Sequence, residues 1–572
     1  KSFRNTNTLN YDFKKLLKND KHHLSALVGQ ELIKVKSNVD TDEVRFYPAS
    51  FNSHQAFNLS SQGTAFSTDK YTNADDILLS YFARANYDYE GKYLISATFR
   101  ADGSSKFADG NRWGYFPSAA VAWRISSENF MEGTKNWLDD LKLRVSYGTA
   151  GNNNIDSDQY RSMYSAKNTA YLEQGTSYWT TGTQLYNPDL KWETTYSTNL
   201  GLDINLFDNR IEFIADFYYK KTKDMLLQIS LPSFLGSSGL GAATNPWGNI
   251  GSLENKGLEL TLNTVNIDTK GFQWRSNFVF SLNRNKVVEM DTETGSLPYE
   301  LQIGDDKQTV TNSMPGYPIG QFWGYKVIGR FNEPTDFYYK TADGTVKEVA
   351  RPEGQSIAEG QTWLGDYIFE DINKDGIIDN KDQTFIGNPE PKFTYGIGNT
   401  FSWKGFDLTI FLSGSYGNDV LNYNRRWLEI SGSNSNLLKS TGYAIVEKID
   451  PNGPDDYRNF HVTGGDANSP RMYTQSSKNL NWRVSDRYVE DGSYLRIQNI
   501  SLGYTLPKKW LQKTPIQNLK IYANLQNVYT WTKYKGYDPE VGSLYGNTLY
   551  NGIDYGRYPS PRIYTFGLNV SF

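Results

Sequence analysis

Apolar and polar side chains alternate along this chain with a period of two over long stretches. In residues 93–102 one face carries Tyr93, Ile95 and Phe99, and the opposite face carries Ser96 and Arg100. A period of two is typical of a strand with one apolar and one polar face, whereas a helix repeats every 3.6 residues. The pattern therefore predicts an all-β protein.

Fifteen segments follow this pattern, and we expect each to be a strand. They are residues 9–19, 22–35, 76–90, 92–103, 114–126, 139–150, 193–207, 210–225, 255–266, 271–284, 393–402, 406–417, 492–506, 517–530 and 561–572. Many exceed the usual strand length of about 5–6 residues. Ten tilted residues at ~3.3 Å each cross the ~25 Å apolar band of an outer membrane.

The connections between these segments alternate in length. The shorter ones are residues 20, 91, 127–138, 208–209, 267–270, 404–405 and 507–516. The others, mostly long, are residues 36–75, 104–113, 151–192, 226–254, 285–392, 418–491 and 531–560. Short periplasmic turns and long extracellular loops are typical of transmembrane antiparallel β-barrels. We therefore predict such a barrel, with its longest extracellular loops at 285–392 and 418–491.

The number of predicted strands is odd, although bacterial single-chain barrels normally have an even number. If the short turns are periplasmic, the last strand ends in the periplasm at Phe572, and Lys1 lies outside the cell. We therefore expect residues 1–572 to be the C-terminal part of a larger barrel.

Composition and charge exclude several classes of protein. Net charge is −4 (59 Lys and Arg against 63 Asp and Glu), which argues against nucleic-acid binding. The chain has no Cys, so it holds no disulfide or thiolate metal site. No run of about 18 apolar residues predicts a transmembrane helix. Aromatic residues make up 15% of the chain, which is high for its 38% of hydrophobic residues and suits a barrel.

One acidic loop has the spacing of a calcium-binding loop. Calcium takes six to eight oxygen ligands, which alternate acidic positions around a Gly turn supply. Gly376 is the sixth residue counted from Asp371. The predicted ligands are Asp371, Asn373, Asp375, the Ile377 carbonyl, Asp379 and Asp382. A short Asp at the twelfth position, in place of the usual Glu, favours a structural calcium ion over a sensing one. The alternative is a surface loop without metal.

No motif predicts an enzyme. The nucleophile-elbow, zinc-protease and phosphate-loop patterns are absent, and none of the four His residues is in ligand spacing with another His on a regular element. We expect the polar-face charges to brace a barrel lumen or contact a plug; they are Arg84, Asp88, Arg100, Asp102, Glu212, Asp216, Lys220 and Glu259. Loop Trp residues either stack on sugars or pack the loops and the membrane interface; they are Trp179, Trp247, Trp323, Trp363, Trp427 and Trp482.

Two local patterns refine the strand prediction. Residues 564–572 place an aromatic or aliphatic side chain at every second position and end on Phe572, as in the last strand of an outer-membrane barrel. In residues 495–504 the apolar phase switches around Gln498 and Asn499, which predicts a β-bulge. Residues 424–430 are predicted to form one or two helical turns within a loop.

Several stretches resemble the SusC/RagA-like family of TonB-dependent transporters from the outer membrane of Bacteroidetes. They are residues 99–107 (FRADGSSKF), 113–123 (WGYFPSAAVAW), 187–193 (NPDLKWE), 254–260 (ENKGLEL), the acidic loop, and 387–396 (GNPEPKFTYG). With the terminal Phe they span most of the chain. The resemblance implies a 22-stranded barrel with an N-terminal plug, of which this chain holds the last fifteen strands.

The resemblance also implies a function and partners. Family members import oligosaccharides, or in some cases peptides, through the outer membrane. A SusD-like surface lipoprotein closes over the extracellular face, and TonB supplies energy through the plug. The plug and its TonB-contacting segment are not among these residues. Two alternatives remain: a passive porin or adhesin-type barrel, and a soluble carbohydrate-binding or carbohydrate-hydrolysing β-protein, which a mean hydropathy of −0.62 would suit.

Overall fold

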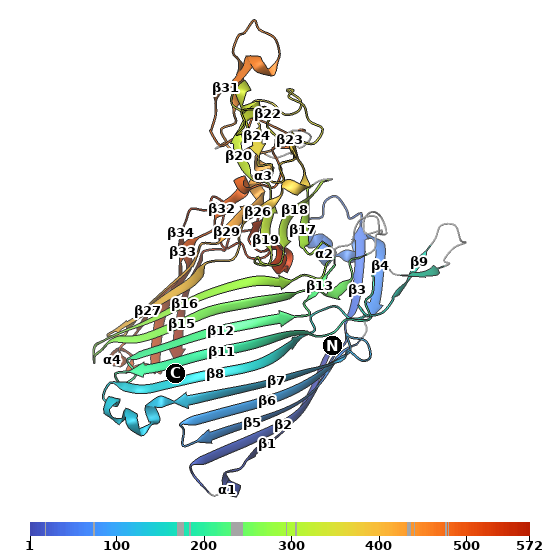
Figure 1. Cartoon of the computed structure of the whole chain (residues 1–572). Coiled ribbons are helices and arrows are strands. Elements are labelled where there is room, and N and C mark those ends of the chain that lie inside the picture. The colour runs from blue at the N-terminus through green and yellow to red at the C-terminus, as the bar shows by residue number, and fades with distance from the viewer. Residues whose placement is uncertain are drawn as a thin grey trace. The chain divides into compact units, whose positions relative to one another are not determined.

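A computed structural model gives the fold of the chain (Figure 1). It describes residues 1–17, 19–72, 75–168, 177–181, 185–229, 244–292, 294–303, 306–431, 436–439, 441–474, 478 and 480–572. These residues form two compact units. Unit 1 comprises Lys1–Asp203 with Tyr218–Glu254, and unit 2 comprises Ile204–Phe217 with Asn255–Phe572.

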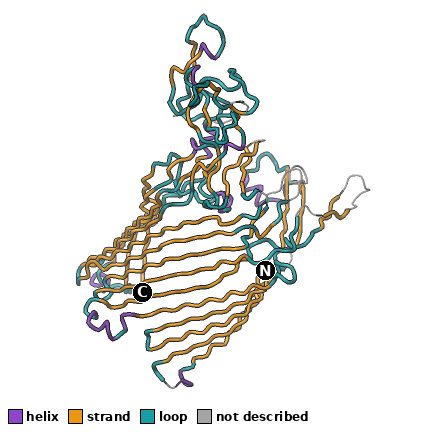
Figure 2. The backbone as a smooth tube through the Cα atoms, in the orientation of Figure 1, coloured by secondary structure: helices purple, strands orange, loops and turns teal. Residues whose placement is uncertain are grey.

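Strands dominate the backbone, as the tube in Figure 2 shows. Fifteen of them follow one another in a single hydrogen-bonded order. They are β1 (Ser2–Asp12), β2 (His22–Val35), β5 (Asp76–Tyr89), β6 (Tyr93–Ser104), β7 (Trp113–Arg124), β8 (Leu138–Asn152), β11 (Glu193–Leu206), β12 (Ile211–Lys223), β15 (Ser252–Asp268), β16 (Phe272–Glu289), β27 (Phe393–Trp403), β28 (Phe406–Tyr416), β33 (Tyr494–Thr505), β34 (Asn518–Thr532) and β36 (Ile563–Ser571). The sequence prediction of fifteen strands in an antiparallel sheet is confirmed.

Both ends of the first strand were predicted wrongly. The first strand was expected at residues 9–19, but β1 ends at Asp12, and the chain then forms the short helix α1 (Lys14–Leu17). The antiparallel register pairs Ser2 with Val35 and Asp12 with Ser25, so β1 begins well before residue 9. Residues 2–8 carry mostly polar side chains, and for this reason the apolar pattern did not reveal them.

The register places the apolar side chains of neighbouring strands in cross-strand rows. Ile95 of β6 pairs with Val121 of β7, which pairs with Val145 of β8. These three side chains are 44%, 51% and 47% exposed. Tyr93, Phe217, Ile521 and Phe566 are also exposed, and Phe213 is partly exposed. An apolar row left open along a long sheet is the surface that lipid would cover.

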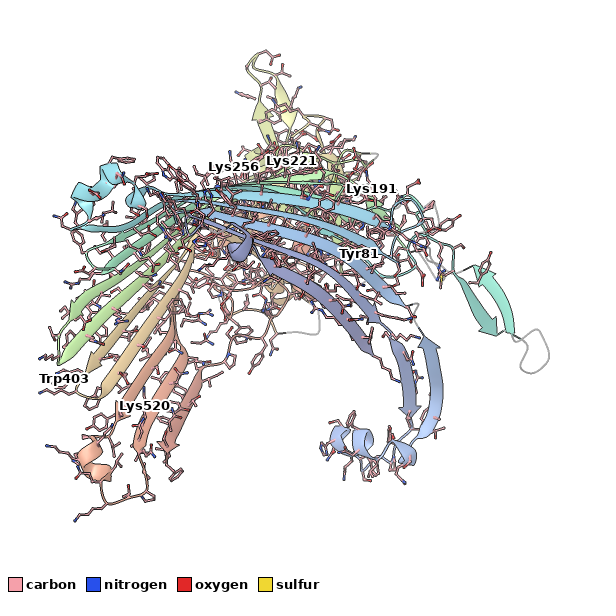
Figure 3. All side chains as sticks on the ribbon, turned by 90° about the horizontal axis from the view of Figure 1, so that it is seen from below. Tyr81, Lys191, Lys221, Lys256, Trp403 and Lys520 are labelled. Atoms are coloured by element: carbon pink, nitrogen blue, oxygen red, sulfur yellow. The ribbon has the colours of Figure 1, made fainter. Side chains whose placement is uncertain are left out.

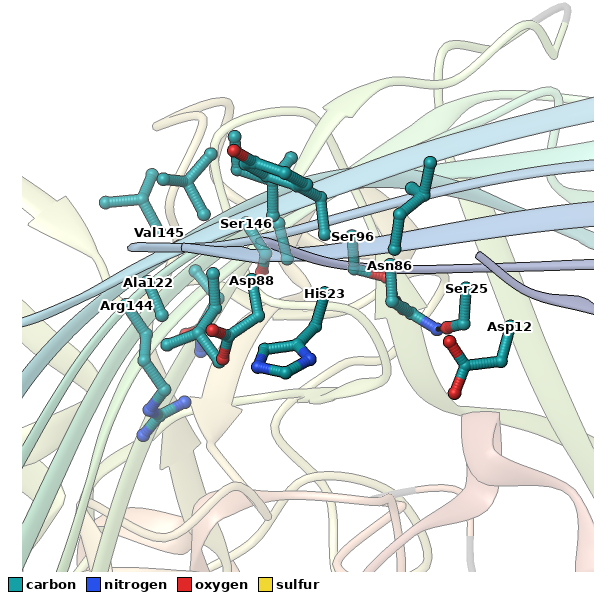
Figure 4. Close-up of a pocket in the computed structure, with 17 residues that line it drawn as sticks. Asp12, His23, Ser25, Asn86, Asp88, Ser96, Ala122, Arg144, Val145 and Ser146 are labelled. Carbon is teal, nitrogen blue, oxygen red and sulfur yellow. Dashed lines mark hydrogen bonds between the residues drawn. The ribbon is translucent and has the colours of Figure 1, made fainter. Parts of the chain in front are cut away.

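The opposite face of the same strands is polar. Among the residues that line a hollow of about 560 Å³ in unit 1, His23, Asp88 and Arg144 lie on one side of the ribbon and Val145 lies on the other (Figure 4). The bulge predicted around Gln498 is confirmed, because the register of β33 against β34 shifts between Ile497 and Asn499.

Helices are few and short in the described residues. They are α1, α2 (Ser53–Asn58), α3 (Tyr423–Leu428), which confirms the helical turns predicted at 424–430, and α4 (Lys508–Leu511). The 3-10 turns are η1 (Ser60–Gln62), η2 (Ile125–Ser127), η3 (Asn129–Thr134), η5 (Pro334–Phe337), η6 (Asn380–Asp382), η7 (Tyr457–Asn459), η8 (Asp486–Tyr488), η9 (Leu544–Gly546) and η10 (Thr548–Tyr550). None of the helices in the described ranges has the length and apolar character needed to cross a membrane.

The long connections contain small sheets of their own. The largest, β17-β18-β19-β26, combines β17 (Leu297–Ile303), β18 (Asp306–Ser313), β19 (Gln321–Gly324) and β26 (Thr384–Gly387). A three-stranded sheet orders β32 (Val489–Asp491), β29 (Asp419–Asn422) and β35 (Ile553–Asp554). The pairs are β3 (Asn38–Arg45) with β4 (Thr64–Thr72), β9 (Tyr164–Asn168) with β10 (Ser177–Thr181), β13 (Leu226–Gln228) with β14 (Trp247–Asn249), β20 (Val327–Arg330) with β24 (Tyr367–Phe369), β21 (Tyr338–Lys340) with β22 (Val346–Glu348), β23 (Arg351–Pro352) with β25 (Ile377–Ile378), and β30 (Ile445–Lys448) with β31 (Phe460–Gly464).

Three of the recognisable stretches meet in a buried cluster of unit 1. Phe107 is fully buried and its ring lies 5.6 Å from that of Trp192, which also packs edge-on against Phe116. Leu190 is fully buried in the same cluster. These residues pack the connections 104–113 and 151–192 against β7. The recognisable stretches in this part of unit 1 therefore reflect side-chain packing.

Candidate functional site

A network of charges lies on the polar face of unit 1. Arg100 Nε lies 2.7 Å from Asp102 Oδ1, and Arg4 Nε lies 2.6 Å from Glu31 Oε1. Arg100 also approaches the second oxygen of Glu31 at 3.6 Å, and both carboxylates are buried. The pairing bears out the expectation that Arg100 and Asp102 brace the polar face. Sequence reasoning missed Glu31, because a single buried Glu in an alternating strand carries no distinguishing signal.

In unit 2, three long connections share one hydrophobic core. Phe322 and Val310 come from residues 285–392, Leu421 and Tyr488 from 418–491, and Ile553 from 531–560. All five side chains are buried to 1% exposure or less. The loops are therefore a packed assembly, and this core fixes the side chains that project from it.

A polar pocket of about 400 Å³ opens in this loop assembly. Its lining includes Asn422, Asn424, Arg425, Leu428, Glu429, Leu438, Thr441, Asp466, Ser469, Arg487, Lys535, Gly536 and Tyr537. Basic and acidic side chains are both present, and Tyr537 is 75% exposed. The pocket thus offers hydrogen-bond donors, acceptors and one aromatic ring, with no large excess of charge.

Ion pairs fix one wall of the pocket. Glu429 accepts hydrogen bonds from Arg425 Nε at 2.9 Å and from Arg487 Nη2 at 2.8 Å. Arg425 Nη1 donates to Glu490 Oε1 at 2.8 Å. The side chains of Glu429 and Arg487 are only 3% and 9% exposed. Because the charges neutralise one another within the wall, an ionic ligand would have to displace an existing partner.

Burial dominates the electrostatics of this wall. It raises the pKa of the Glu429 carboxyl, and the attraction of Arg425 opposes that shift. Burial also lowers the pKa of the Arg487 guanidinium. The Tyr443 hydroxyl, whose neighbour is Glu429, has its pKa raised to about 12, first by burial and then by that negative charge.

The loop Trp residues serve mainly in packing. Trp363 and Trp482 are buried in small loop clusters, and Trp427 and Trp247 pack against larger ones. Trp323 donates its indole N–H to Gln383 at 2.9 Å. The side chain of Trp179 lies outside the described residues. Of the two interpretations of these residues, loop packing is the one that the described side chains support.

The acidic loop is an ordered turn. Asp371 Oδ2 accepts from Gly376 N at 2.9 Å, and fully buried Asp382 accepts from Ile372 N and Asp379 N, each at 2.9 Å. Within the described ranges, no group of three or more His, Asp or Glu side chains stands in a geometry that could hold a metal ion. Several of the predicted ligand oxygens instead accept hydrogen bonds from backbone N–H groups.

Comparison with known proteins identifies the family. Residues 2–528 match the family described as "TonB dependent receptor-like, beta-barrel". TonB-dependent receptor P3 of Formosa agariphila is 34% identical over 100% of this chain and 53% of the receptor. TonB-dependent receptor SusC of Bacteroides thetaiotaomicron is 31% identical over 86% of this chain and 44% of that protein. A solved structure titled "Structure of the RagAB peptide transporter" shares the fold, with a TM-score of 0.70 and 23% identity over 100% of this chain and 55% of that one.

The chain belongs to the TonB-dependent receptor-like β-barrel family, and its sequence is similar to that of SusC. It is therefore an outer-membrane β-barrel protein, as the sequence predicted, and the soluble alternative is wrong. The chain spans about half the length of the curated relatives it matches. Those relatives are named as receptors.

Substitution of Glu429 tests whether the ion pairs hold the pocket wall in place. Glu429→Gln leaves Arg425 and Arg487 buried without their shared carboxylate, which costs about 3–5 kcal/mol when a buried ion pair loses one partner. We expect faster hydrogen exchange at the backbone amides of 425–429 and 487–490 in the full-length protein. Glu447→Gln, at an exposed position of β30, is the matched control and should exchange like the parent. Equal exchange in both variants would mean that the ion pairs do not hold the wall.

Proposed function

We propose that this protein is part of an active importer of the outer membrane that takes up oligosaccharides with energy transmitted by TonB. The observation that carries the proposal is the match of residues 2–528 to the TonB-dependent receptor-like barrel family. A lipid-facing apolar face and a braced polar face suit a passage through the membrane.

The chemistry of the loop pocket supports an oligosaccharide cargo. Sugar hydroxyls need many donors and acceptors, and the apolar face of a sugar ring packs on an aromatic side chain. Asn424 and Thr441 supply polar groups, and the exposed Tyr537 supplies the ring. A peptide is the alternative cargo. The ion pairs of Glu429 engage Arg425 and Arg487, which reduces the charge available for peptide termini to that of Asp466 and Lys535 and favours the neutral sugar.

We further propose that a SusD-like surface lipoprotein closes over the long extracellular loops. The packed assembly of residues 285–392 and 418–491 offers a firm surface for such a partner, since three connections share its core. TonB would act through an N-terminal plug. Accordingly, we propose that residues 1–572 are the C-terminal part of a larger barrel, which their coverage of about half of the curated relatives supports.

Dependence of uptake on TonB is the decisive property of the proposed function. Cells that express the full-length protein with its lipoprotein partner are offered labelled malto-, β-gluco- and fructo-oligosaccharides, with a casein digest in parallel. We expect at least one oligosaccharide to enter wild-type cells and to remain bound at the surface, without entry, in cells lacking TonB. Labelled oligosaccharide inside and outside the cell envelope is measured after fractionation.

The control is the same strain with TonB restored, which should regain entry. Entry that persists without TonB would contradict the active mechanism and favour a passive porin. TonB-dependent entry of the casein peptides alone would retain the importer but replace its cargo.

We also propose that the acidic loop binds one structural calcium ion. The oxygen spacing of Asp371, Asn373, Asp375, the Ile377 carbonyl, Asp379 and Asp382 supports it. Asp371 Oδ1 is buried and has no hydrogen-bond partner among the described residues. Ligand binding would require the other carboxylates to exchange their backbone N–H partners for the ion.

Calcium should therefore stabilise the full-length protein against heat. A ligand that binds only the folded state at about 100 times its dissociation constant adds about 2.7 kcal/mol. We expect calcium to raise the melting temperature of the parent and of Asp455→Asn, an exposed control in another loop, and to have no effect on Asp375→Asn/Asp379→Asn. A calcium response in the double variant equal to that of the parent would place the ion elsewhere, and no response in the parent would refute the site.

A further inference from the structure

The turn between β33 and β34 is unusually basic. It contains Lys508, Lys509 and Lys513, all exposed, around the 66% exposed indole of Trp510. From residue 492 to residue 537 the sequence contains no Asp or Glu. No carboxylate of the turn or its two flanking strands therefore offsets these three positive charges.

The turn has a defined conformation that presents these side chains together. α4 begins after Pro507, and Trp510 N donates to the Pro507 carbonyl at 2.9 Å. Leu511 is buried and anchors the helix, and Thr514 N donates to the Leu511 carbonyl at 2.9 Å. With Leu511 held inward, the helical turn leaves Trp510 and the three lysines on its outer side.

This basic turn continues the lipid-facing apolar face of unit 2. Tyr504 pairs across the strands with the exposed side chain of Ile521. The ring centroid of Tyr504 lies 4.3 Å from that of Phe406. The neighbouring turn repeats the combination of an aromatic side chain and a lysine. Exposed Trp403, labelled in Figure 3, is followed by Lys404, whose Nζ lies 5.4 Å from the centre of the Trp403 ring. Aromatic side chains followed by lysines mark the depth at which hydrocarbon gives way to lipid headgroups.

A second short turn has the same order of residue types. α1 is Lys-Lys-Leu-Leu at residues 14–17, and α4 is Lys-Lys-Trp-Leu at residues 508–511. Leu16, at the position equivalent to Trp510, is 64% exposed. By contrast, the turn after β5 is neutralised, because Glu90 pairs with Lys21 at 2.6 Å and approaches Lys92 at 3.8 Å. Excess positive charge is thus a property of particular turns.

We propose that the α4 turn is a binding site for anionic phospholipid headgroups in the membrane leaflet that adjoins the short turns of the sheet. Trp510 enters the headgroup layer beside the acyl chains, and Lys508, Lys509 and Lys513 contact the lipid phosphates. Each lysine at an anionic lipid surface strengthens binding about fivefold. The inference depends on the outer-membrane location and is independent of the cargo.

Titration of the delipidated full-length protein with single lipids tests this site. Native mass spectrometry counts bound dioleoylphosphatidylglycerol and dioleoylphosphatidylcholine on the parent, on Lys508→Gln/Lys509→Gln/Lys513→Gln, and on the matching triple Arg variant. We expect the parent and the Arg variant to prefer phosphatidylglycerol. We expect the Gln variant to bind phosphatidylglycerol at least about tenfold more weakly, with phosphatidylcholine binding unchanged.

Two controls separate this site from general charge effects. Lys340→Gln/Lys347→Gln/Lys533→Gln removes the same charge from exposed positions outside the short turns and should keep the lipid preference. Trp510→Ala, which keeps the lysines, should weaken binding of both lipids, and heat-dependent gel migration verifies that each variant is folded. An unchanged phosphatidylglycerol preference in the α4 Gln variant, an equal loss in the distant triple variant, or displacement of the lipid by inorganic phosphate would overturn the proposal.

Discussion

The structure depends on one constraint: a chain that crosses hydrocarbon must satisfy every backbone N–H and C=O group within the protein, because the lipid offers no partner. The thirteen strands between β1 and β36 meet this requirement, since each has a hydrogen-bonded neighbour on both sides. Since successive side chains of a strand point to opposite faces, the same ladder sorts the sequence into a lipid-facing row such as Ile95, Val121 and Val145 and a polar row. The alternation of apolar and polar residues is therefore a direct consequence of lipid on one face of the sheet and polar surroundings on the other.

This constraint explains what could be predicted from the sequence. Lipid on one face imposes alternation over whole strands, so all fifteen strands, the bulge at Gln498 and the sorting of connection lengths were readable from local pattern. The first boundary was not, because residues 2–8 carry mostly polar side chains and their place is set by pairing with β2. The position of β1 depends on its register against β2, and the local alternation of side chains carries no information on that register.

The loop assembly could not be derived in the same way. Its contacts join residues far apart in the chain: Glu429 meets Arg487, and Asp366 meets Arg471 across 105 positions. Outside the membrane, water can satisfy the backbone, so no periodic rule ties the sequence to the structure. The pocket wall and the shared core of the three connections consequently had no signal in local composition, whereas the acidic loop was noticed because its ligand spacing is local.

The two parts of the protein have complementary roles. The sheet supplies a rigid framework, and the long connections, which lie outside the lipid, line a pocket with polar groups and one aromatic ring. Specificity among family members is therefore expected to lie in the loops, while the strands keep their two-faced pattern. The lysine-rich turns are a third element, because they lie where the apolar face of the sheet ends and charged headgroups begin.

The most direct test of the account is a scan of β6 with single cysteines, since residues 1–572 contain no native Cys. Spin labels at positions 93–102 of the full-length protein in lipid bilayers would report collisions with oxygen, which concentrates in hydrocarbon, and with a water-soluble nickel chelate. The account predicts oxygen maxima at Tyr93, Ile95 and Phe99 and chelate maxima at the alternate positions. Chelate access at Ile95 and Phe99, or no alternation along the strand, would contradict it.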